Sequence, residues 1–325
     1  MLPATAISLA VLAALLAWPV PAALARARWP RRDPLAAQVC WQAIGLAGGL
    51  SIIGALLVHG LAPWGHSLPE AWWHWVTRQP AQEVVRGDHW VAQTLAAVLA
   101  LELLGVLLLS GVRTARTRRR HRALLELVVR PGAAAPVDAA SPVEDEAPVE
   151  DETLLLDHPA PVAFCIPGAR PLLVLSSGMV AELDPAQLDA VVAHERAHLR
   201  EHHHLLLLPF VAWRAALPVL PAADRAHDAV RDLVEMRADD VALTALTGPD
   251  PRRTLAAAIV AAAGGSGGQV PEGALAVSGG PVAVRVRRLL APADPLPARA
   301  RWTALACAVA LLLVPTVLLL LPALV

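Results

Sequence analysis

The sequence predicts a mainly α-helical, multi-pass membrane protein that carries a separate cytoplasmic α+β domain. Hydrophobic residues make up 56% of its 325 residues, and the mean hydropathy is +0.52. Soluble domains contain about 45–50% apolar residues, so a large part of this chain is expected to lie in lipid. Four apolar stretches are long enough to span a bilayer, and the segment between the third and the fourth mixes helical and strand-like patterns.

The four predicted spans cover about residues 2–24, 41–61, 90–112 and 302–325. The first stretch could instead be a cleaved signal peptide. Its amino-terminal end lacks positive charge, however, and a second span follows closely, so a retained helix is predicted. The predicted organisation is a membrane domain over residues 1–112, a linker over 113–152, a cytoplasmic domain over 153–300 and a closing span within 301–325.

Arginines predict the orientation of the spans, because cytoplasmic connections carry an excess of positive charge. They crowd the segments after the first span, after the third and before the fourth: Arg26, Arg28, Arg31, Arg32; Arg113, Arg116, Arg118, Arg119, Arg120, Arg122; Arg299, Arg301. The connection between spans two and three has Arg78 and Arg86, offset by three acidic residues. Both chain ends are therefore predicted outside the cell membrane and the segment 113–301 in the cytoplasm. The net charge of −1 argues against a nucleic-acid partner.

Two polar features of the membrane part have more than one interpretation. Glu102 lies in the middle of the third span, where a carboxylate is costly. It is either a functional group that faces the bundle or a hydrogen-bond partner of a neighbouring helix. Tryptophans around the second connection indicate an interfacial aromatic belt, with a ligand-sensing surface as the alternative; they are Trp64, Trp72, Trp73, Trp75 and Trp90.

The cytoplasmic segment begins with residues that have little to bury. Residues 130–152 are rich in Pro, Ala and acidic residues and predict a disordered linker. Residues 172–175 predict a strand, closed by Ser-Ser-Gly, and a strand upstream of the next helix could offer an edge along which a peptide lies extended. The glycines of 264–268 predict a flexible loop, and residues 284–290 a basic helix.

The clearest chemical signal is the segment His194-Glu195-Arg196-Ala197-His198. Upstream, Asp184-Pro185-Ala186-Gln187 supplies an N-cap, a first-turn proline and a capping-box glutamine, so the motif is predicted to lie inside a helix. Histidines four residues apart share one helix face, where both imidazoles can bind one zinc ion. The glutamate between them can take the proton of the attacking water. This pattern is typical of a zinc peptidase; the alternative is a solvated, His-rich surface that binds metal adventitiously.

A third protein ligand is needed, and Glu235 is the predicted one. Glu235 and Asp239 lie four residues apart on a helix predicted over 224–246. Glu235 is expected to bind zinc, and Asp239 to hydrogen-bond the outer nitrogen of a ligand imidazole and so fix its tautomer.

His204 is the competing candidate, because it has the spacing of a third histidine that follows a glycine turn. That turn needs a glycine where this chain has Glu201, so the helix is expected to continue and to direct His204 away from the metal. His202 and His203 are interpreted as a polar helix end.

Residues 205–222 are nearly all apolar and test this topology. A single crossing of the membrane would place Glu235 and the histidines on opposite sides, and the segment is too short to cross twice. It is therefore predicted to be a helical piece that packs on the zinc site or rests on the inner membrane face.

The three leading spans, the cytoplasmic zinc domain, the closing span and the Glu-x-x-Ala-Asp motif at 235–239 resemble the BlaR/MecR-type membrane metallopeptidases. The resemblance covers nearly the whole chain and is most specific over residues 172–199, 224–242 and 285–290. It implies a gluzincin-like peptidase fold with zinc ligands at His194, His198 and Glu235 and a catalytic glutamate at Glu195. Members with a sensor carry an extracellular penicillin-binding domain after the last span. The sequence stops at Val325, so β-lactam sensing through such a domain is not expected.

The resemblance also implies metal-assisted peptide hydrolysis, with a BlaI/MecI-type repressor or the enzyme's own linker as substrate. Since the sequence contains no tyrosine, the group that stabilises the oxyanion must be His, Arg or backbone N–H, with His227 and Arg285 among the candidates. Two alternatives are a housekeeping membrane protease similar to the CAAX-processing or HtpX-type enzymes and a non-enzymatic transducer that uses the zinc domain as a fold.

Overall fold

The computed structural model describes residues 2–77, 87–128, 152–168, 171–216, 221–265 and 280–320. The chain forms two compact units. The membrane-helix unit comprises Met1–Gly111, Leu207–Arg231 and Leu296–Val325, and the sheet unit comprises Val112–Leu206 and Asp232–Pro295. Most of the predicted linker 130–152 and of the glycine-rich loop 264–268 lies outside the described residues.

Four helices among the described residues are long and apolar enough to cross a membrane: Leu2–Arg26, Pro34–Trp64, Gly87–Thr117 and Ala298–Leu320. They coincide with the four predicted spans, except for residues 321–325, which lie outside the described residues. The prediction of a mainly helical protein with four membrane-length helices is confirmed. These lengths correspond to the roughly 20 apolar residues that a bilayer requires.

The first membrane-length helix is divided by proline. α1 (Leu2–Ala17) ends before Pro19, and α2 (Pro19–Arg26) begins there, because proline lacks the N–H that a continuing helix needs. After the short η1 (Trp29–Arg31), the Asp33 side chain accepts a hydrogen bond from the Ala36 N–H and caps α3 (Pro34–Leu61).

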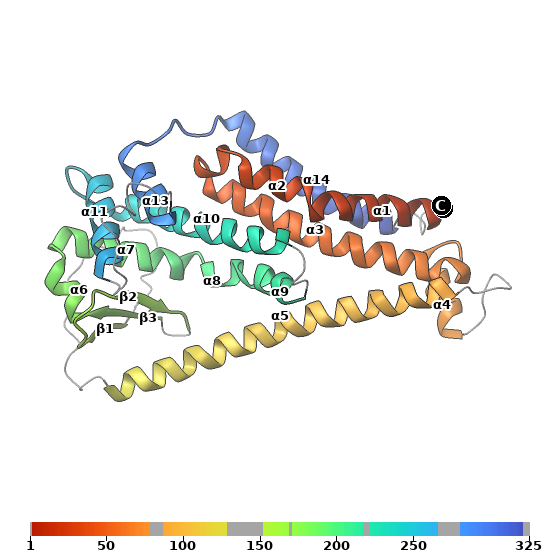
Figure 1. The fold of residues 1–325 in the computed structure, drawn as a ribbon, viewed down its shortest axis with the longest axis horizontal. Helices are drawn as coiled ribbons and strands as arrows, with labels where there is room; N and C mark the ends of the chain where they lie inside the picture. Colours follow the sequence, from red (N-terminus) through yellow and green to blue (C-terminus); the bar gives the residue numbers. More distant parts are fainter. Residues whose placement is uncertain are drawn as a thin grey trace. The chain divides into compact units, whose positions relative to one another are not determined.

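Helix α3 packs against both α1 and α14 (Ala298–Leu320), and the three helices run side by side in Figure 1. Gly54 permits this packing: a Cβ added there would lie 3.1 Å from Leu319 of α14 and 3.4 Å from Leu9 of α1. Because the glycine has no side chain, both neighbours contact α3 closely.

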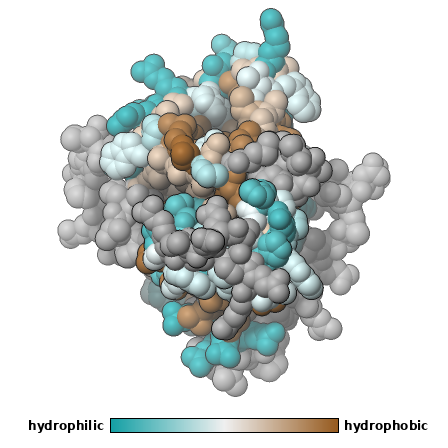
Figure 2. All heavy atoms as spheres, turned by 90° about the vertical axis from the view of Figure 1, so that its right-hand side faces the viewer, coloured by the Kyte–Doolittle hydropathy of each residue, from teal (hydrophilic) through white to brown (hydrophobic). Residues whose placement is uncertain are grey.

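After η2 (Ala62–Trp64), the connection to the third span contains α4 (Leu68–Thr77). Trp64 is buried, whereas Trp72 and Trp73 are 55% and 66% exposed. Figure 2 looks onto one face of the molecule, where hydrophobic residues reach the surface between hydrophilic ones. Trp72 and Trp73 lie on α4, in the connection between two membrane-length helices, where an interfacial belt would place exposed tryptophans.

Helix α5 (Gly87–Val128) extends well beyond the predicted third span. The residues after Val112 contain no glycine or proline until Pro131, so nothing in the sequence stops the helix there. The first part of the predicted linker is thus helical. Glu102 is exposed on α5 and does not face the interior of the membrane-helix unit.

The apolar segment 205–222 divides between the units, and most of it belongs to the membrane-helix unit. α8 (His203–Leu206) is followed by α9 (Leu208–Ala216), which packs on α3. The Trp213 ring lies over two glycines of α3: a Cβ added at Gly49 would lie 2.8 Å from it, and one at Gly45 3.7 Å from it. Helices α8 and α9 and the start of α10 are therefore helical as predicted, and α9 packs on a membrane-length helix.

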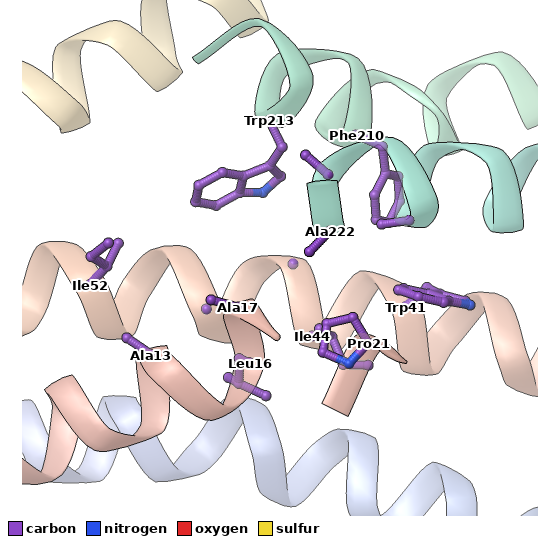
Figure 3. Close-up of a pocket in the computed structure, with 14 residues that line it drawn as sticks. Ala13, Leu16, Ala17, Pro21, Trp41, Ile44, Ile52, Phe210, Trp213 and Ala222 are labelled. Carbon is purple, nitrogen blue, oxygen red and sulfur yellow. The ribbon is translucent and has the colours of Figure 1, made fainter. Parts of the chain in front are cut away.

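An apolar cavity of about 100 Å³ lies where α9 and the first turns of α10 (Pro221–Ala245) face α1, α2 and α3. Phe210, Trp213 and Ala222 reach towards Trp41, Ile44 and Ile52 of α3 in Figure 3. Outside the cavity, the Arg225 guanidinium lies 5.3 Å from the centre of the Trp18 ring. Apolar contacts and one cation–π contact thus hold the segment Leu207–Arg231 on α1–α3.

The sheet of the second unit has three strands in the order β1-β3-β2. β3 (Leu172–Ser176) pairs in parallel with β1 (Glu152–Leu156) and antiparallel with β2 (Ala163–Ile166). All five residues of β3 are buried, as expected for the central strand. The predicted strand 172–175 is therefore the centre of the sheet, and the edge next to the motif helix is β2.

Serine and glycine close the central strand as the sequence predicts. The Ser176 hydroxyl accepts from the Met179 N–H at 3.0 Å and caps α6 (Ser177–Glu182), and it donates to the Ala160 carbonyl at 2.8 Å. A Cβ added at Gly178 would overlap the Pro159 carbonyl. A larger residue would therefore displace the loop that leads into β2.

Helix α7 (Pro185–Arg200) begins with the predicted capping box, in which Asp184 and Gln187 satisfy each other's backbone N–H. Alternate residues of β3 (Leu173 and Leu175) pack against Val192 of α7, and the other face of the sheet forms a second apolar cluster. Helices α6, α7, α10, α11 (Pro251–Gly265) and α13 (Pro281–Leu290) share one larger core. α7 is thus held between the sheet and the helices.

Candidate metal centre

Three potential metal-binding side chains converge in the sheet unit. His194 and His198 lie one turn apart on α7, and Glu235 comes from α10. One ligand atom from each residue lies within 4.8 Å of the other two, so the cluster could hold a metal ion. It is formed by the three residues that the sequence predicted as ligands.

The spacing of the donor atoms suits a tetrahedral ion. His194 Nε2 lies 3.2 Å from His198 Nε2 and 3.4 Å from Glu235 Oε2, and His198 Nε2 lies 3.6 Å from Glu235 Oε1. Zinc bonds of about 2.0–2.1 Å at tetrahedral angles place neighbouring ligands roughly 3.3–3.5 Å apart. Two imidazoles and one carboxylate also form a common ligand set of catalytic zinc, which keeps a fourth position open. The residues therefore fit a zinc ion.

Asp239 supports the first histidine from the side opposite the cluster. Its Oδ1 lies 3.0 Å from His194 Nδ1, and the Asp239 side chain is 1% exposed. A carboxylate in this place favours the tautomer that carries its proton on Nδ1 and leaves Nε2 free for a metal. The sequence suggested a hydrogen bond in this place; the two atoms lie at a suitable distance, but their relative orientation is not that of a well-formed hydrogen bond.

Arg285 on α13 ties the two carboxylates of α10 together. Its Nε and NH2 groups donate to Asp239 at 2.8 and 2.6 Å, and its NH1 donates to Glu235 at 2.9 Å. The bidentate contact with Asp239 is of the strong, charge-assisted kind. By contrast, His227 lies in the membrane-helix unit and contacts Asp228. Of the two named oxyanion candidates, Arg285 is the one beside the cluster.

These contacts set the charge states of the cluster without a metal. Burial lowers the pKa of His198 to about 4, and the charge of His194 adds to this effect, so His198 is neutral. Burial alone would also lower the pKa of His194, but its contacts with Asp239 and Glu235 raise it to about 9. Burial opposes ionisation of Glu235, yet its contacts with His194 and Arg285 lower its pKa to about 2. Metal binding would therefore displace a proton from His194.

Glu195 lies next to the cluster on the wall of a cavity of about 240 Å³. Burial raises the pKa of this carboxyl to about 7, although the Cys165 backbone N–H of β2 donates to it. A carboxyl with a pKa near neutrality can both accept and return a proton. The rest of the cavity wall is largely apolar and includes Leu255, Ala258, Ile259 and Ala262 of α11.

The end of α7 differs from the sequence-based expectation. The helix was expected to continue through Glu201, but it ends at Arg200, and His202 adopts a left-handed backbone with φ +50°. His203, interpreted as part of a polar helix end, is instead 2% exposed and lies against His198. The cluster that the described residues form contains Glu235 and not His204. The local break depends on buried contacts that helix propensity does not register.

The similarity to known proteins lies in the same part of the chain. Residues 138–293 match the model of a metallopeptidase family, and that family is Peptidase family M48. Comparisons with curated proteins and with solved structures gave no match. The matched segment contains His194, His198, Glu235, Asp239 and Arg285. Together with the four membrane-length helices, it supports a membrane metallopeptidase.

Proposed function

We propose that this protein is a membrane-anchored, zinc-dependent endopeptidase whose active site faces the cytoplasm. The observation that carries the proposal is the convergence of His194, His198 and Glu235 with Glu195 beside them, inside the segment that matches the peptidase family. A structural zinc site closes its fourth position with protein and needs no neighbouring base. This site has a cavity and a buried glutamate at that place.

Each residue has a defined part in peptide hydrolysis. A zinc ion held by the cluster would polarise the scissile carbonyl and lower the pKa of the attacking water. Glu195 accepts the proton of the water and returns it to the leaving amine. Arg285, on the wall of the same cavity, provides positive charge for the oxygen that becomes negative in the transition state.

The sheet edge suggests how a peptide substrate binds. β2 is the terminal strand next to α7, and among the described strands it pairs with β3 alone. Its Cys165 N–H contacts Glu195, so an extended peptide added along β2 would pass the catalytic carboxylate. The apolar side chains of α11 would accept an apolar residue next to the scissile bond.

For the biological role, we infer regulated cleavage of a cytoplasmic repressor of the BlaI/MecI type or of the protein's own linker. The inference rests on the resemblance to the BlaR/MecR-type enzymes in the order of spans, zinc motif and closing span. Signal transduction through the membrane helices follows from this role.

A housekeeping membrane protease similar to the CAAX-processing or HtpX-type enzymes is the second candidate. In those enzymes membrane spans usually separate the zinc motif from the third ligand. Here none of the four membrane-length helices of the described residues lies between His198 and Glu235, which disfavours this candidate, although Leu207–Arg231 belongs to the membrane-helix unit and packs on α3.

The decisive experiment combines zinc content with proteolysis in the purified full-length protein. We expect one zinc per chain in the wild type, retained zinc with lost cleavage in Glu195→Gln, and lost zinc in Glu235→Ala. The substrates are the protein itself and a co-expressed repressor, with a generic unfolded protein for the housekeeping alternative. Glu182→Gln, the same change at an exposed helix end, is the matched control.

Full zinc in Glu235→Ala would move the third ligand elsewhere. Full cleavage in the presence of Glu195→Gln would contradict the assignment as a peptidase and would favour the non-enzymatic transducer. Cleavage of the unfolded protein with the repressor left intact would select the housekeeping role.

A further inference from the structure

A series of polar side-chain contacts begins at His198 and leads away from the metal cluster. His198 Nδ1 lies 3.0 Å from His203 Nδ1, and His203 Nε2 lies 3.1 Å from Glu201 Oε2. Glu201 in turn accepts from Arg237 Nε at 2.9 Å and from Arg237 NH2. The contacts connect the turn after α7 with α10, two residues beyond Glu235.

The protons of this series of contacts can be placed in one consistent way. Arg237 donates only, and the Glu201 carboxylate accepts, so His203 must donate to Glu201 through Nε2–H. A neutral His203 then offers a lone pair at Nδ1, to which His198 donates its Nδ1–H. His198 is left with a lone pair on Nε2, the atom that faces His194 and Glu235.

We propose that His203, held by Glu201 and Arg237, is a positioning residue that fixes the tautomer and ring orientation of His198 for metal binding. The proposal rests on the metal site described under the proposed function and adds an outer partner for the second histidine. His194 has Asp239 in the same role, so each imidazole ligand would have its own support.

The backbone conformation next to His203 brings its ring into contact with His198. The left-handed conformation of His202 ends α7 and turns the chain so that the imidazole five residues after His198 comes back against it. A non-glycine residue in this region is uncommon and persists where surrounding contacts stabilise it. His203 is 2% exposed and both its ring nitrogens are occupied, so the turn buries a polar ring with partners at both ends.

His203 is not itself placed as a ligand. Its Nδ1 faces the outer nitrogen of His198, and its Nε2 faces a carboxylate that is bound by an arginine. The other role open to His203 is a simple filler of the space behind His198. A filler would affect stability, whereas a positioning residue also affects metal affinity and the environment of the bound ion.

The test measures zinc affinity by competition with a chelator in the full-length protein, together with the absorption of a bound cobalt(II) ion. His203→Leu keeps the volume and removes the acceptor. We expect zinc to bind roughly 10- to 100-fold more weakly, as found when outer partners of ligand histidines are lost, with an altered cobalt spectrum. His203→Asn places an amide oxygen near the position of Nδ1 and should recover most of the affinity.

His202→Asn is the matched control, since it removes an exposed imidazole from the same turn and asparagine tolerates the left-handed conformation. It should leave zinc affinity unchanged. Thermal unfolding of the metal-free variants identifies any that fail to fold, and Glu201→Gln, which weakens the far end of this series of contacts, then tests the same idea with a smaller expected loss.

The two proposals fail in different ways. If the wild type binds no zinc, the metal site itself is wrong. If the wild type binds zinc and His203→Leu binds it equally well with an unchanged cobalt spectrum, His203 is a filler and the positioning role is overturned. Equal losses in the Leu and Asn variants would also overturn it, because the acceptor would not matter.

Discussion

Trp213 in the membrane-helix unit and Arg285 in the sheet unit each join helices that are distant in sequence, but they do so through different forces. The indole ring rests on the backbone of α3 at Gly45 and Gly49, where fit and apolar contact decide the packing. The guanidinium binds Asp239 and Glu235 and is 12% exposed. The contact of Trp213 with α3 depends on close packing, and the contacts of Arg285 depend on the balance of buried charges. Substitutions of similar size should therefore have different effects on stability in the two units.

The largest effect should follow removal of the arginine. Arg285→Met keeps much of the volume but removes the bidentate guanidinium from the buried Asp239 carboxylate, which is left with His194 as its remaining positive neighbour. Breaking a buried pair in this way costs up to about 3–5 kcal/mol, and the partial exposure of Glu235 moderates this value. Thermal unfolding of the metal-free protein should show the loss, and added zinc should recover part of it.

Arg288→Met is the control for that measurement, since Arg288 pairs with Asp240 on the same two helices at a more exposed position. It should be clearly milder. Equal destabilisation by both substitutions would show that the deeper burial of the Arg285 pair does not increase its contribution to stability.

Asp239→Asn should act on metal binding more than on folding. The amide keeps the shape, but it weakens the contact with His194 Nδ1 and the bidentate contact with Arg285. Zinc affinity should fall roughly 10- to 100-fold. Chelator competition would measure it, with Asp240→Asn as the neighbouring control; an unchanged affinity would contradict the supporting role of Asp239.

Gly49→Ala tests the contact that depends on shape. Its new Cβ would lie 2.8 Å from the rigid Trp213 ring, so α9 must shift or the ring must leave α3. Overpacking of this kind costs about 1–3 kcal/mol. Unfolding in detergent should show the loss, and Trp213→Leu in the same chain should remove most of the clash.

The double-mutant comparison is informative because the two residues are in contact. Additive losses from Gly49→Ala and Trp213→Leu would mean that the ring does not rest on this glycine.

The smallest effect is expected for Arg214→Gln. Arg214 pairs with Asp224 at 2.9 Å in the membrane-helix unit, but both side chains are about half exposed. Exposed pairs of this kind contribute about 0–1 kcal/mol. Thermal unfolding should change little; a loss as large as that of Arg285→Met would contradict the contrast between the units.

Much of the architecture could be predicted from the chain because its causes are local. The four membrane-length helices follow from apolar runs, and the start of α7 follows from Asp184 and Gln187, which lie within one turn of each other. The strand at 172–175 and its closure by Ser176 and Gly178 are local in the same sense.

The end of α7 and the position of α9 could not be predicted in this way. Glu201 favours helix by propensity, yet its carboxylate binds Arg237, 36 residues away, and the chain turns at His202. The glycines of α3 gave no sign by themselves that Trp213, more than 160 residues later, would rest on them. Such contacts depend on which surfaces meet after folding.

The sequence by itself determined that His194 and His198 share one helix face, because the helical repeat fixes the relation of residues four apart. It also indicated Glu235 and Asp239 as a pair on one face of a later helix. Only the tertiary structure decided that this pair meets the histidines, that Arg285 bridges it, and that His203 lies behind His198. The reason is physical: local periodicity sets the direction of a side chain on its own helix, whereas packing of the core decides which side chains it faces.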